Sequence, residues 1–240
     1  MESDKLNEVE FQRNYYAKTA NEYDDMHLGG TDKGEHFFAL SFLLSAIDYF
    51  NINSILDIGS GTGSAIDYIK KHKPDIRIVG VEPVHELRLI GYSKNLSENE
   101  LVDGDATNLQ FSNGEFDLVC EFGVLHHIKY PERAVSEMLR VANKLIFISD
   151  SNNFGQGSFL ARFIKQLLNT FGLWRVADFI KTRGKGFTVS EGDGLAYSYS
   201  VFNNYNLIES NCRKIHLLNT VDGRINPYRT ASHIALLGVK

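Results

Sequence analysis

Residues 55–63 read Ile55-Leu-Asp-Ile-Gly-Ser-Gly-Thr-Gly63, an apolar run that ends in three glycines separated by single residues. The apolar run is typical of a buried strand, and helical spacing begins again at residues 66–72. Glycines allow a tight turn that lies close to a ligand, and the free amides of a helix that opens there point at that ligand. The pattern therefore predicts a strand, a ligand-binding turn and a helix. Taken alone it is weak evidence, because ordinary tight loops also contain such glycines.

The segments around this turn alternate between short apolar strands and helices. The predicted strands are residues 55–58, 76–81, 116–120 and 145–148, and the predicted helices between them are residues 66–72 and 132–141. Pro131 suits the first turn of the second helix, where its missing N–H has no partner to lose. Strands that are apolar throughout, separated by helices, indicate a Rossmann-like, doubly wound α/β sheet that is mostly parallel.

Other patterns flank this core. Residues 6–23 show an imperfect helical spacing, residues 33–50 a clear one, and residues 156–182 an amphipathic helix with a second helix after Gly172. Residues 214–218 and 232–239 read as strands that pair as an antiparallel hairpin across a loop at Asp222-Gly223. We expect one domain over residues 1–240. Its parts are a helical cap (1–50), a cofactor-binding core (51–150), a helical insertion or lid (151–200) and C-terminal strands that complete the sheet (201–240).

Composition excludes several classes of protein. The 240 residues include 25 Lys and Arg against 30 Asp and Glu, for a formal charge of −5. An acidic chain is a poor bulk binder of nucleic acid, which needs cations against phosphates. The polar N-terminus has no apolar signal core, and no apolar run approaches the roughly 20 residues that span a bilayer. Two cysteines do not form a disulfide framework. These features predict a soluble, cytoplasmic protein.

Three acidic residues make the glycine turn more specific. Asp57 lies inside the apolar strand, where a carboxylate is costly unless it meets a cation or several donors. Glu82 follows Gly63 by 19 residues at the end of the second strand, where a carboxylate can accept ribose hydroxyls. Asp105 follows the short apolar step Leu101-Val102. The spacing therefore predicts a nucleoside ligand at the carboxyl edge of the sheet.

Taken together, residues 57–63, Glu82, Gly104-Asp-Ala-Thr107 and Phe116-Asp-Leu-Val119 resemble the class I S-adenosylmethionine-dependent methyltransferases. The resemblance covers roughly residues 50–150 and extends to a Leu-His-His run that is common in one large branch of the family. It implies S-adenosyl-L-methionine as the cofactor and a seven-stranded sheet with an antiparallel last strand, which agrees with the hairpin inferred above.

The resemblance also implies roles for individual residues. Asp57 would lie near the amino group of the cofactor, Glu82 would hold the ribose, and Asp105 with Ala106 would flank the adenine. Tyr23 lies in a stretch that closes over the cofactor in related enzymes, although a helix buried through its aromatic side explains that stretch equally well. The full set of predicted cofactor-binding residues is Tyr23, Asp57, Gly59, Ser60, Gly61, Gly63, Glu82, Pro83, Asp105, Ala106, Glu121 and Phe122.

A nicotinamide dinucleotide is the alternative ligand for a glycine turn of this kind. Its fingerprint has two residues between the second and third glycines, and its pyrophosphate lies on the helix N-terminus. Here Thr62 alone separates Gly61 from Gly63, and Asp57 would repel a phosphate. The charges favour a ligand that carries a positive amine and sulfonium.

Methyl transfer is a direct displacement that depends on positioning, and a hydroxyl or amine acceptor also benefits from a base. Glu121, Phe122, His126 and His127 follow the fourth strand, whose carboxyl end faces ligands in open sheets. His126 is the predicted catalytic base, and the alternative is that one histidine fixes the loop. Two adjacent histidines without a carboxylate or cysteine at ligand spacing predict no metal site.

The insertion is expected to select the acceptor. Residues 156–186 contain one acid, Asp178, and six basic residues: Arg162, Lys165, Arg175, Lys181, Arg183 and Lys185. The surplus indicates either a solvated helix face or a lid that binds an anionic acceptor, and contact with a membrane surface is a less favoured alternative.

We therefore predict methyl transfer to an oxygen or nitrogen of a small molecule, such as a sugar, a secondary metabolite or a lipid-like precursor. The expected enzyme is a monomer or homodimer that does not bind nucleic acid. The alternative function is a cofactor-binding module that has lost catalysis and acts through a protein partner.

Overall fold

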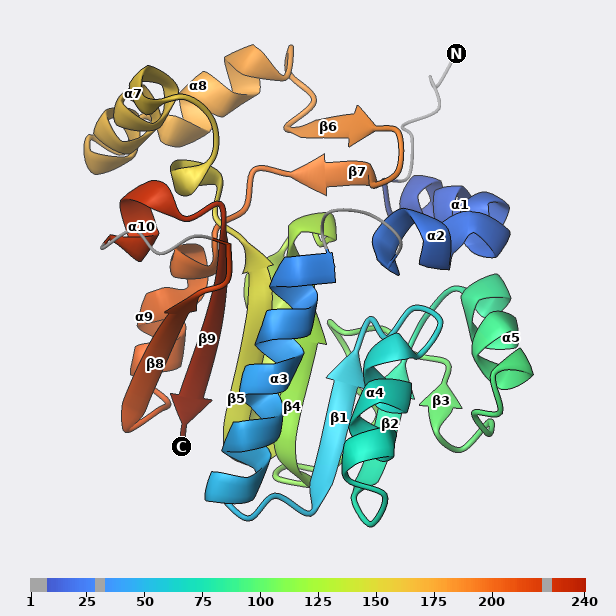
Figure 1. Cartoon of the computed structure of the whole chain (residues 1–240). Helices are drawn as coiled ribbons and strands as arrows, with labels where there is room; N and C mark the ends of the chain where they lie inside the picture. The colour runs from blue at the N-terminus through green and yellow to red at the C-terminus, as the bar shows by residue number, and fades with distance from the viewer. Residues whose placement is uncertain (1–7, 29–32, 222–225) are drawn as a thin grey trace.

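The computed structural model describes residues 8–28, 33–221 and 226–240. Its centre is a seven-stranded sheet in the order β3-β2-β1-β4-β5-β9-β8, in which β9 runs opposite to the other six strands (Figure 1). The strands are β1 (Ser54–Ile58), β2 (Arg77–Val81), β3 (Leu101–Val102), β4 (Phe116–Phe122), β5 (Ala142–Ser151), β8 (Lys214–Asn219) and β9 (His233–Val239). The predicted fold class and the predicted pairing of the last two strands are confirmed. The loop expected at Asp222-Gly223 lies outside the described residues.

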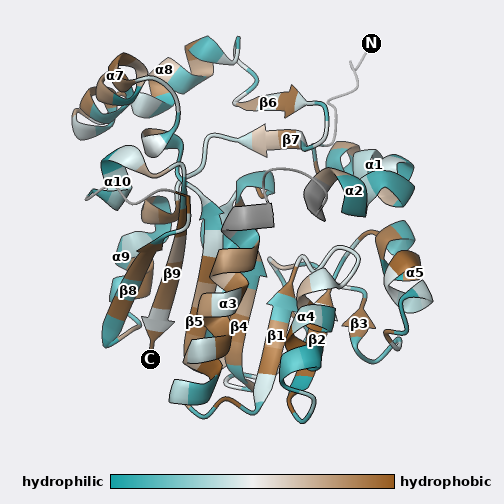
Figure 2. Ribbon diagram, in the orientation of Figure 1, coloured by the Kyte–Doolittle hydropathy of each residue, from teal (hydrophilic) through white to brown (hydrophobic). Residues whose placement is uncertain are grey.

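Helices cover both faces of this sheet, and each face has its own hydrophobic core. The helices are α3 (Lys33–Tyr49), α4 (Ser64–His72), α5 (His85–Ser93), α6 (Pro131–Val141) and α9 (Tyr205–Glu209). One core joins α3 and α4 to the sheet, and the other joins α6 and α9 to the opposite face. Because the strands are buried on both sides, they read as continuous apolar runs. Figure 2 shows hydrophobic residues along the central strands.

The helix α6 illustrates how the local sequence produces these elements. Pro131 occupies its first turn, as predicted. Its buried residues Ala134, Val135, Met138 and Leu139 recur at helical spacing, so that one stripe faces the core. Polar residues occupy the other side.

Smaller elements lie above the carboxyl edge of the sheet (Figure 1). From the N-terminus come α1 (Glu8–Thr19), η1 (Ala20–Glu22) and α2 (Tyr23–Leu28), whereas α3 packs along the sheet face. The insertion supplies η3 (Asn153–Gly155), α7 (Phe159–Thr170), α8 (Trp174–Lys181) and a hairpin of β6 (Phe187–Ser190) with β7 (Gly194–Tyr197). Further elements are η2 (Leu125–His127), η4 (Val201–Asn204) and α10 (Pro227–Thr230).

The insertion was predicted in part. The second helix expected after Gly172 is confirmed, because α7 ends before Gly172, whose φ of 70° ends the first helix, and α8 follows it. The hairpin β6–β7 was not anticipated, because its strands have four residues each and β6 is largely exposed, so that neither shows a clear apolar alternation. This hairpin contacts α1, which closes the layer over the sheet edge.

Candidate functional site

The glycine turn after β1 has the tight backbone that its sequence predicts. Gly59 and Gly61 have φ values of 66° and 55°, in the left-handed region that other residues rarely adopt. A Cβ atom on Gly59 would lie 2.5 Å from a methyl of Val124, and one on Gly61 would lie 2.7 Å from the hydroxyl of Tyr23. Side chains at these positions would therefore collide with the loops that surround the turn.

Two adjoining cavities open beside this turn at the carboxyl edge of the sheet. The larger cavity is about 630 Å³ and the smaller is about 310 Å³. Tyr16, Tyr23, Gly59, Phe122 and His127 contribute to the walls of both. Of the predicted residues, the larger cavity also brings together Asp57, Ser60 and His126, and the smaller brings together Glu82, Pro83, Asp105 and Ala106.

Glu82 lies at the tip of β2 with only 5% of its surface exposed. One carboxylate oxygen accepts the amide of Gly61 at 2.9 Å, and the other accepts the amide of Val84 at 2.8 Å. Burial raises the pKa of Glu82 to about 7, against the opposing effect of these two hydrogen bonds. The side chain therefore connects the glycine turn to the start of α5 and changes charge near neutral pH.

Asp57 is the second buried carboxylate, at the end of β1 and on the wall of the larger cavity. Burial raises its pKa to about 7, although the hydroxyl of Ser60 and the thiol of Cys120 oppose this effect. The thiol donates to Oδ1 at 3.8 Å, which is a weak contact for an anion. A cationic group in the larger cavity would stabilise the charged form of Asp57.

Asp105 joins the loop after β3 to the N-terminal helix. Its Oδ2 pairs with Arg13 at 2.7 Å, while its Oδ1 accepts the amide and hydroxyl of Thr107. Burial alone would raise the pKa of Asp105, but the bonds from Thr107 and the charge of Arg13 lower it. Arg13 was missed by the sequence analysis, because its partner is 92 residues away in the chain.

Three of the predicted residues do not appear on the cavity walls. Gly61 lies beneath Tyr23, and Gly63 begins α4, where a Cβ atom would lie 2.2 Å from a methyl of Leu96. Glu121 was expected beside the ligand, but it is fully buried and accepts the amide of Val124. Successive side chains of a strand point to opposite faces, so that Phe122 reaches the cavities and Glu121 does not.

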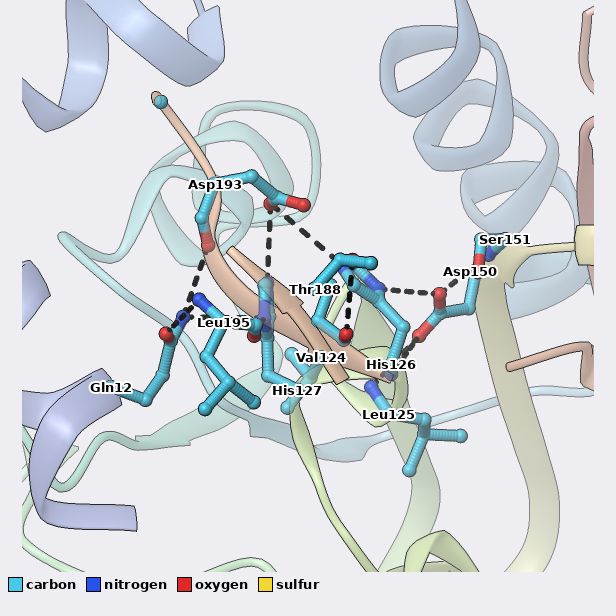
Figure 3. Close-up of polar contacts among 12 residues, drawn as sticks. Gln12, Val124, Leu125, His126, His127, Asp150, Ser151, Thr188, Asp193 and Leu195 are labelled. Carbon is cyan, nitrogen blue, oxygen red and sulfur yellow. Dashed lines mark hydrogen bonds and ion pairs between the residues drawn. The ribbon is translucent and has the colours of Figure 1, made fainter. Parts of the chain in front are cut away.

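His126 is held by a buried carboxylate at the end of β5 (Figure 3). Its Nδ1 lies 2.7 Å from Oδ1 of Asp150, whose other oxygen accepts the amide of Leu125 at 2.8 Å. Burial alone would lower the pKa of His126, but the carboxylates of Asp150 and Asp193 raise it well above its ordinary value. The pKa of Asp150 falls to about 2, because His126 and the amide of Ser151 outweigh its burial.

Asp193, in the turn of the β6–β7 hairpin, faces both histidines (Figure 3). Its Oδ1 is 3.6 Å from Nε2 of His126 and 3.3 Å from Nε2 of His127. His127 also places Nδ1 2.6 Å from the carbonyl of Leu195 and Nε2 3.0 Å from the hydroxyl of Tyr16. His127 thus fixes the loop and the hairpin, whereas Nε2 of His126 has a more distant partner.

The sequence carried different signals for these partners. Asp150 ends an apolar strand, as Glu82 does, so that the same rule could have identified it. Asp193 lies in the polar segment Glu191-Gly-Asp-Gly194, where nothing local indicates a histidine partner. Tyr16 lies on the walls of both cavities, in the same N-terminal segment as Tyr23, but was not among the predicted site residues.

Among the described residues, the side chains of His126, His127 and Asp193 could offer ligand atoms to a cation, because these atoms lie within 4.8 Å of one another. The carboxylate that the sequence analysis found missing is therefore supplied by the hairpin. Protein groups already bond both ring nitrogens of His127, however. The cluster is satisfied by hydrogen bonds and ion pairs without a metal.

Comparisons with known proteins agree with this geometry. Residues 56–145 match the family model described as a methyltransferase domain. Norajmaline N-methyltransferase of Rauvolfia serpentina is 30% identical over 157 residues, covering 56% of this chain and 53% of that protein. Ribosomal RNA small subunit methyltransferase C of Pasteurella multocida is 34% identical over 103 residues, covering 42% of this chain and 31% of that protein. The chain thus spans about half or less of the length of these curated relatives.

A solved structure extends the likeness of the fold to nearly the whole chain. The crystal structure of magnesium protoporphyrin IX methyltransferase from Synechocystis PCC 6803 with bound S-adenosylmethionine has a TM-score of 0.62 and 13% identity. The match covers 99% of each chain. At this identity, the comparison shows a shared fold.

Proposed function

We propose that this chain, a member of the class I S-adenosylmethionine-dependent methyltransferase family, transfers a methyl group from S-adenosylmethionine to an oxygen or nitrogen of a small molecule. The observation that carries the proposal is the meeting of two cavities at the glycine turn. One cavity has a buried acid at the tip of β2, and the other has a histidine held by a buried aspartate. A cofactor site beside an acceptor site is what a methyl transfer requires.

The residues of the two cavities fit this cofactor. In its ionised form Glu82 can accept both hydroxyls of a ribose, because each carboxylate oxygen keeps a lone pair beyond its backbone bond. Asp57 is a buried carboxylate with a weak donor, so that a positively charged amine would compensate its burial. Asp105 and Ala106 lie in the smaller cavity, where the adenine would be flanked.

When bound, the cofactor supplies an electrophilic methyl group on a positively charged sulfur. The task of the protein is then to hold the acceptor in line and to exclude water. Tyr16 and Tyr23 lie on the walls of both cavities, so that they can cover the junction between cofactor and acceptor.

His126 is the proposed base for the acceptor. Its side chain lines the larger cavity, and Asp150 on Nδ1 holds the orientation of the ring. In the structure the neighbouring carboxylates favour the protonated form, which cannot accept a proton. An acceptor that takes the place of Asp193 beside Nε2 would remove one of these carboxylates and restore the base. Deprotonation of the acceptor would thus be coupled to its arrival.

A small-molecule acceptor is supported by the dimensions of the site. The larger cavity is about 630 Å³, within the range of roughly 300–1,000 Å³ typical of small-ligand pockets, and it would hold the acceptor together with the amine end of the cofactor beside Asp57. One matched relative is named as an N-methyltransferase of the small molecule norajmaline. The other relative is named for ribosomal RNA, a substrate that the acidic charge of this chain does not favour.

The test is product formation. The purified protein is incubated with S-adenosylmethionine and a panel of alcohols, sugars, amines and phenols, and release of S-adenosylhomocysteine is followed by mass spectrometry. We expect turnover with one class of acceptor, and a large loss of kcat in His126→Ala but not in His216→Ala, a matched change at an exposed position on β8. Cofactor binding without turnover on any acceptor would favour the non-catalytic module. If the protein bound neither S-adenosylmethionine nor S-adenosylhomocysteine, both the methyltransferase and the non-catalytic module would be rejected.

A further inference from the structure

Helices α7 and α8 carry an unusual share of exposed apolar side chains. Nineteen large hydrophobic residues are exposed in the described part of the chain, and ten of them lie between residues 159 and 180. We call these ten residues the α7–α8 face: Phe159, Leu160, Phe163, Ile164, Leu167, Phe171, Leu173, Val176, Phe179 and Ile180. Figure 2 shows hydrophobic residues on α7, outside the sheet core. Exposed apolar side chains gathered on one pair of helices mark an interaction site.

The orientation of α7 is the reverse of that expected for a surface helix, which turns its apolar side to the core. Here the polar side faces the protein. Lys165 donates to the carbonyl of Asn153, Gln166 donates to the carbonyl of Phe154 at 3.0 Å, and Asn169 donates to the hydroxyl of Tyr228 at 3.0 Å. These bonds hold the apolar side outward. Its exposure is therefore built into the fold.

The charges around this face have one sign. The insertion, residues 156–186, contains six basic residues and one acid, so its formal charge is +5 in a chain whose formal charge is −5. None of the six forms an ion pair with another residue of the described chain, and Arg175, Lys181, Arg183 and Lys185 are exposed. Two helices that carry exposed apolar side chains and are accompanied by four exposed cations suit a surface of acyl chains and anionic headgroups.

The end of α8 adjoins the proposed active site. A polar cleft of about 260 Å³ is lined by Lys181 and Thr182 at the end of α8, and also by His126 and Asp193. Figure 1 shows α7 and α8 on the same side of the sheet as its carboxyl edge. A headgroup held at α8 would thus have a polar route to the histidine.

We propose that the α7–α8 face docks on an anionic lipid membrane. A second copy of this chain is the less favoured occupant, because a two-fold interface would bring the +5 surfaces of both copies together. A lipid surface offers the opposite charge together with an apolar layer. From the sequence alone, membrane contact was the less favoured alternative, because the sequence does not show whether these helices turn their apolar residues inward or outward. Docking is independent of the proposed methyl transfer, so that either can fail alone.

Vesicle sedimentation tests the proposal. The protein is spun with vesicles of phosphatidylcholine alone and with vesicles that also contain phosphatidylglycerol. We expect binding to the anionic vesicles, weakened by salt. The double variant Phe159→Ser and Phe163→Ser should lose at least about tenfold in partition coefficient, because two aromatic anchors leave the lipid. Both side chains are more than half exposed, so that the fold should survive. The control Tyr49→Ser, at an exposed aromatic residue at the end of α3, should bind like the wild type.

The electrostatic part has its own matched pair. Arg175→Gln with Lys185→Gln should weaken binding to anionic vesicles by about fivefold for each cation removed. Arg213→Gln with Lys214→Gln makes the same change of net charge at exposed positions by β8 and should have less than about a twofold effect. No binding to anionic vesicles at low salt would overturn the proposal. The proposal would also be overturned if the wild type formed a dimer in sedimentation velocity, did not bind vesicles, and became a monomer in the Phe159→Ser and Phe163→Ser variant. That result would assign the face to a second copy. Cofactor affinity, measured on the same samples, reports separately on the proposed function.

Discussion

Cofactor affinity should fall when the pH is lowered through neutrality, because two acids of the site must be ionised to bind. Burial raises the pKa of both Glu82 and Asp57 to about 7 in the free protein. Ribose hydroxyls and a cationic amine favour the charged forms, so that the pKa of each group is lower in the complex. The binding energy is then fully present above the free-state pKa and is lost as the pH falls below it.

The size of the effect follows from the pKa of the free protein. A group with a pKa of about 7 is about nine-tenths ionised at about pH 8 and about one-tenth ionised at about pH 6, which costs about tenfold in affinity. Glu82 and Asp57 together can cost up to about a hundredfold, or about 2.7 kcal/mol. Glu82→Gln removes one of the two groups. It should also bind about 10–100-fold more weakly at about pH 8, because a charged hydrogen bond to the ribose is lost.

Isothermal titration calorimetry with S-adenosylhomocysteine across this pH range provides the measurement. Repeating it in buffers of different ionisation enthalpy counts the protons released on binding. The ligand amine also titrates, but its contribution to proton release is the same for the wild type and the variants and cancels when they are compared. At about pH 6 the wild type should release about one proton more than Glu82→Gln. Glu86→Gln, an exposed change in the first turn of α5, should behave like the wild type. An affinity independent of pH, or a Gln variant with an unchanged slope, would refute the reasoning.

Four further outcomes follow from the site. Asp193→Asn should move the acidic limb of the pH profile of kcat/KM to lower pH, because the pKa of His126 falls when this carboxylate is neutralised. An unmoved limb would show that Asp193 does not affect the pKa of His126. Gly61→Val should abolish cofactor binding in calorimetry while melting stays cooperative, since its Cβ would reach the ring of Tyr23, and normal affinity would contradict this placement. Gly80→Ala should lower the free energy of unfolding in urea by about 1–3 kcal/mol, because its Cβ would press on side chains beneath the glycine turn; no change would mean that those side chains yield freely. Dialysis against EDTA should leave kcat unchanged, because protein groups already satisfy the histidine cluster, and activity restored only by a divalent cation would assign a metal instead.

The sequence by itself determined the parts of this protein that depend on neighbours in the chain. The apolar runs and the glycines of residues 55–63 predicted the strand, the turn and the helix, and the spacing to Glu82 predicted an acid at the same sheet edge. These inferences held because the carboxyl ends of parallel strands meet at one edge, so that chain order alone brings Asp57, Glu82 and Phe122 together.

Only the tertiary structure decided which side chains meet across the upper layer. Asp193 reaches His126 because the β6–β7 hairpin folds back over the sheet, and Arg13 reaches Asp105 because α1 lies beside the loop after β3. The direction of α7 was equally hidden. Its periodicity showed an apolar stripe, but the contacts of Lys165 with Asn153 and of Asn169 with Tyr228 hold that stripe outward. Periodicity reports the geometry of one element, whereas burial depends on every element that packs against it.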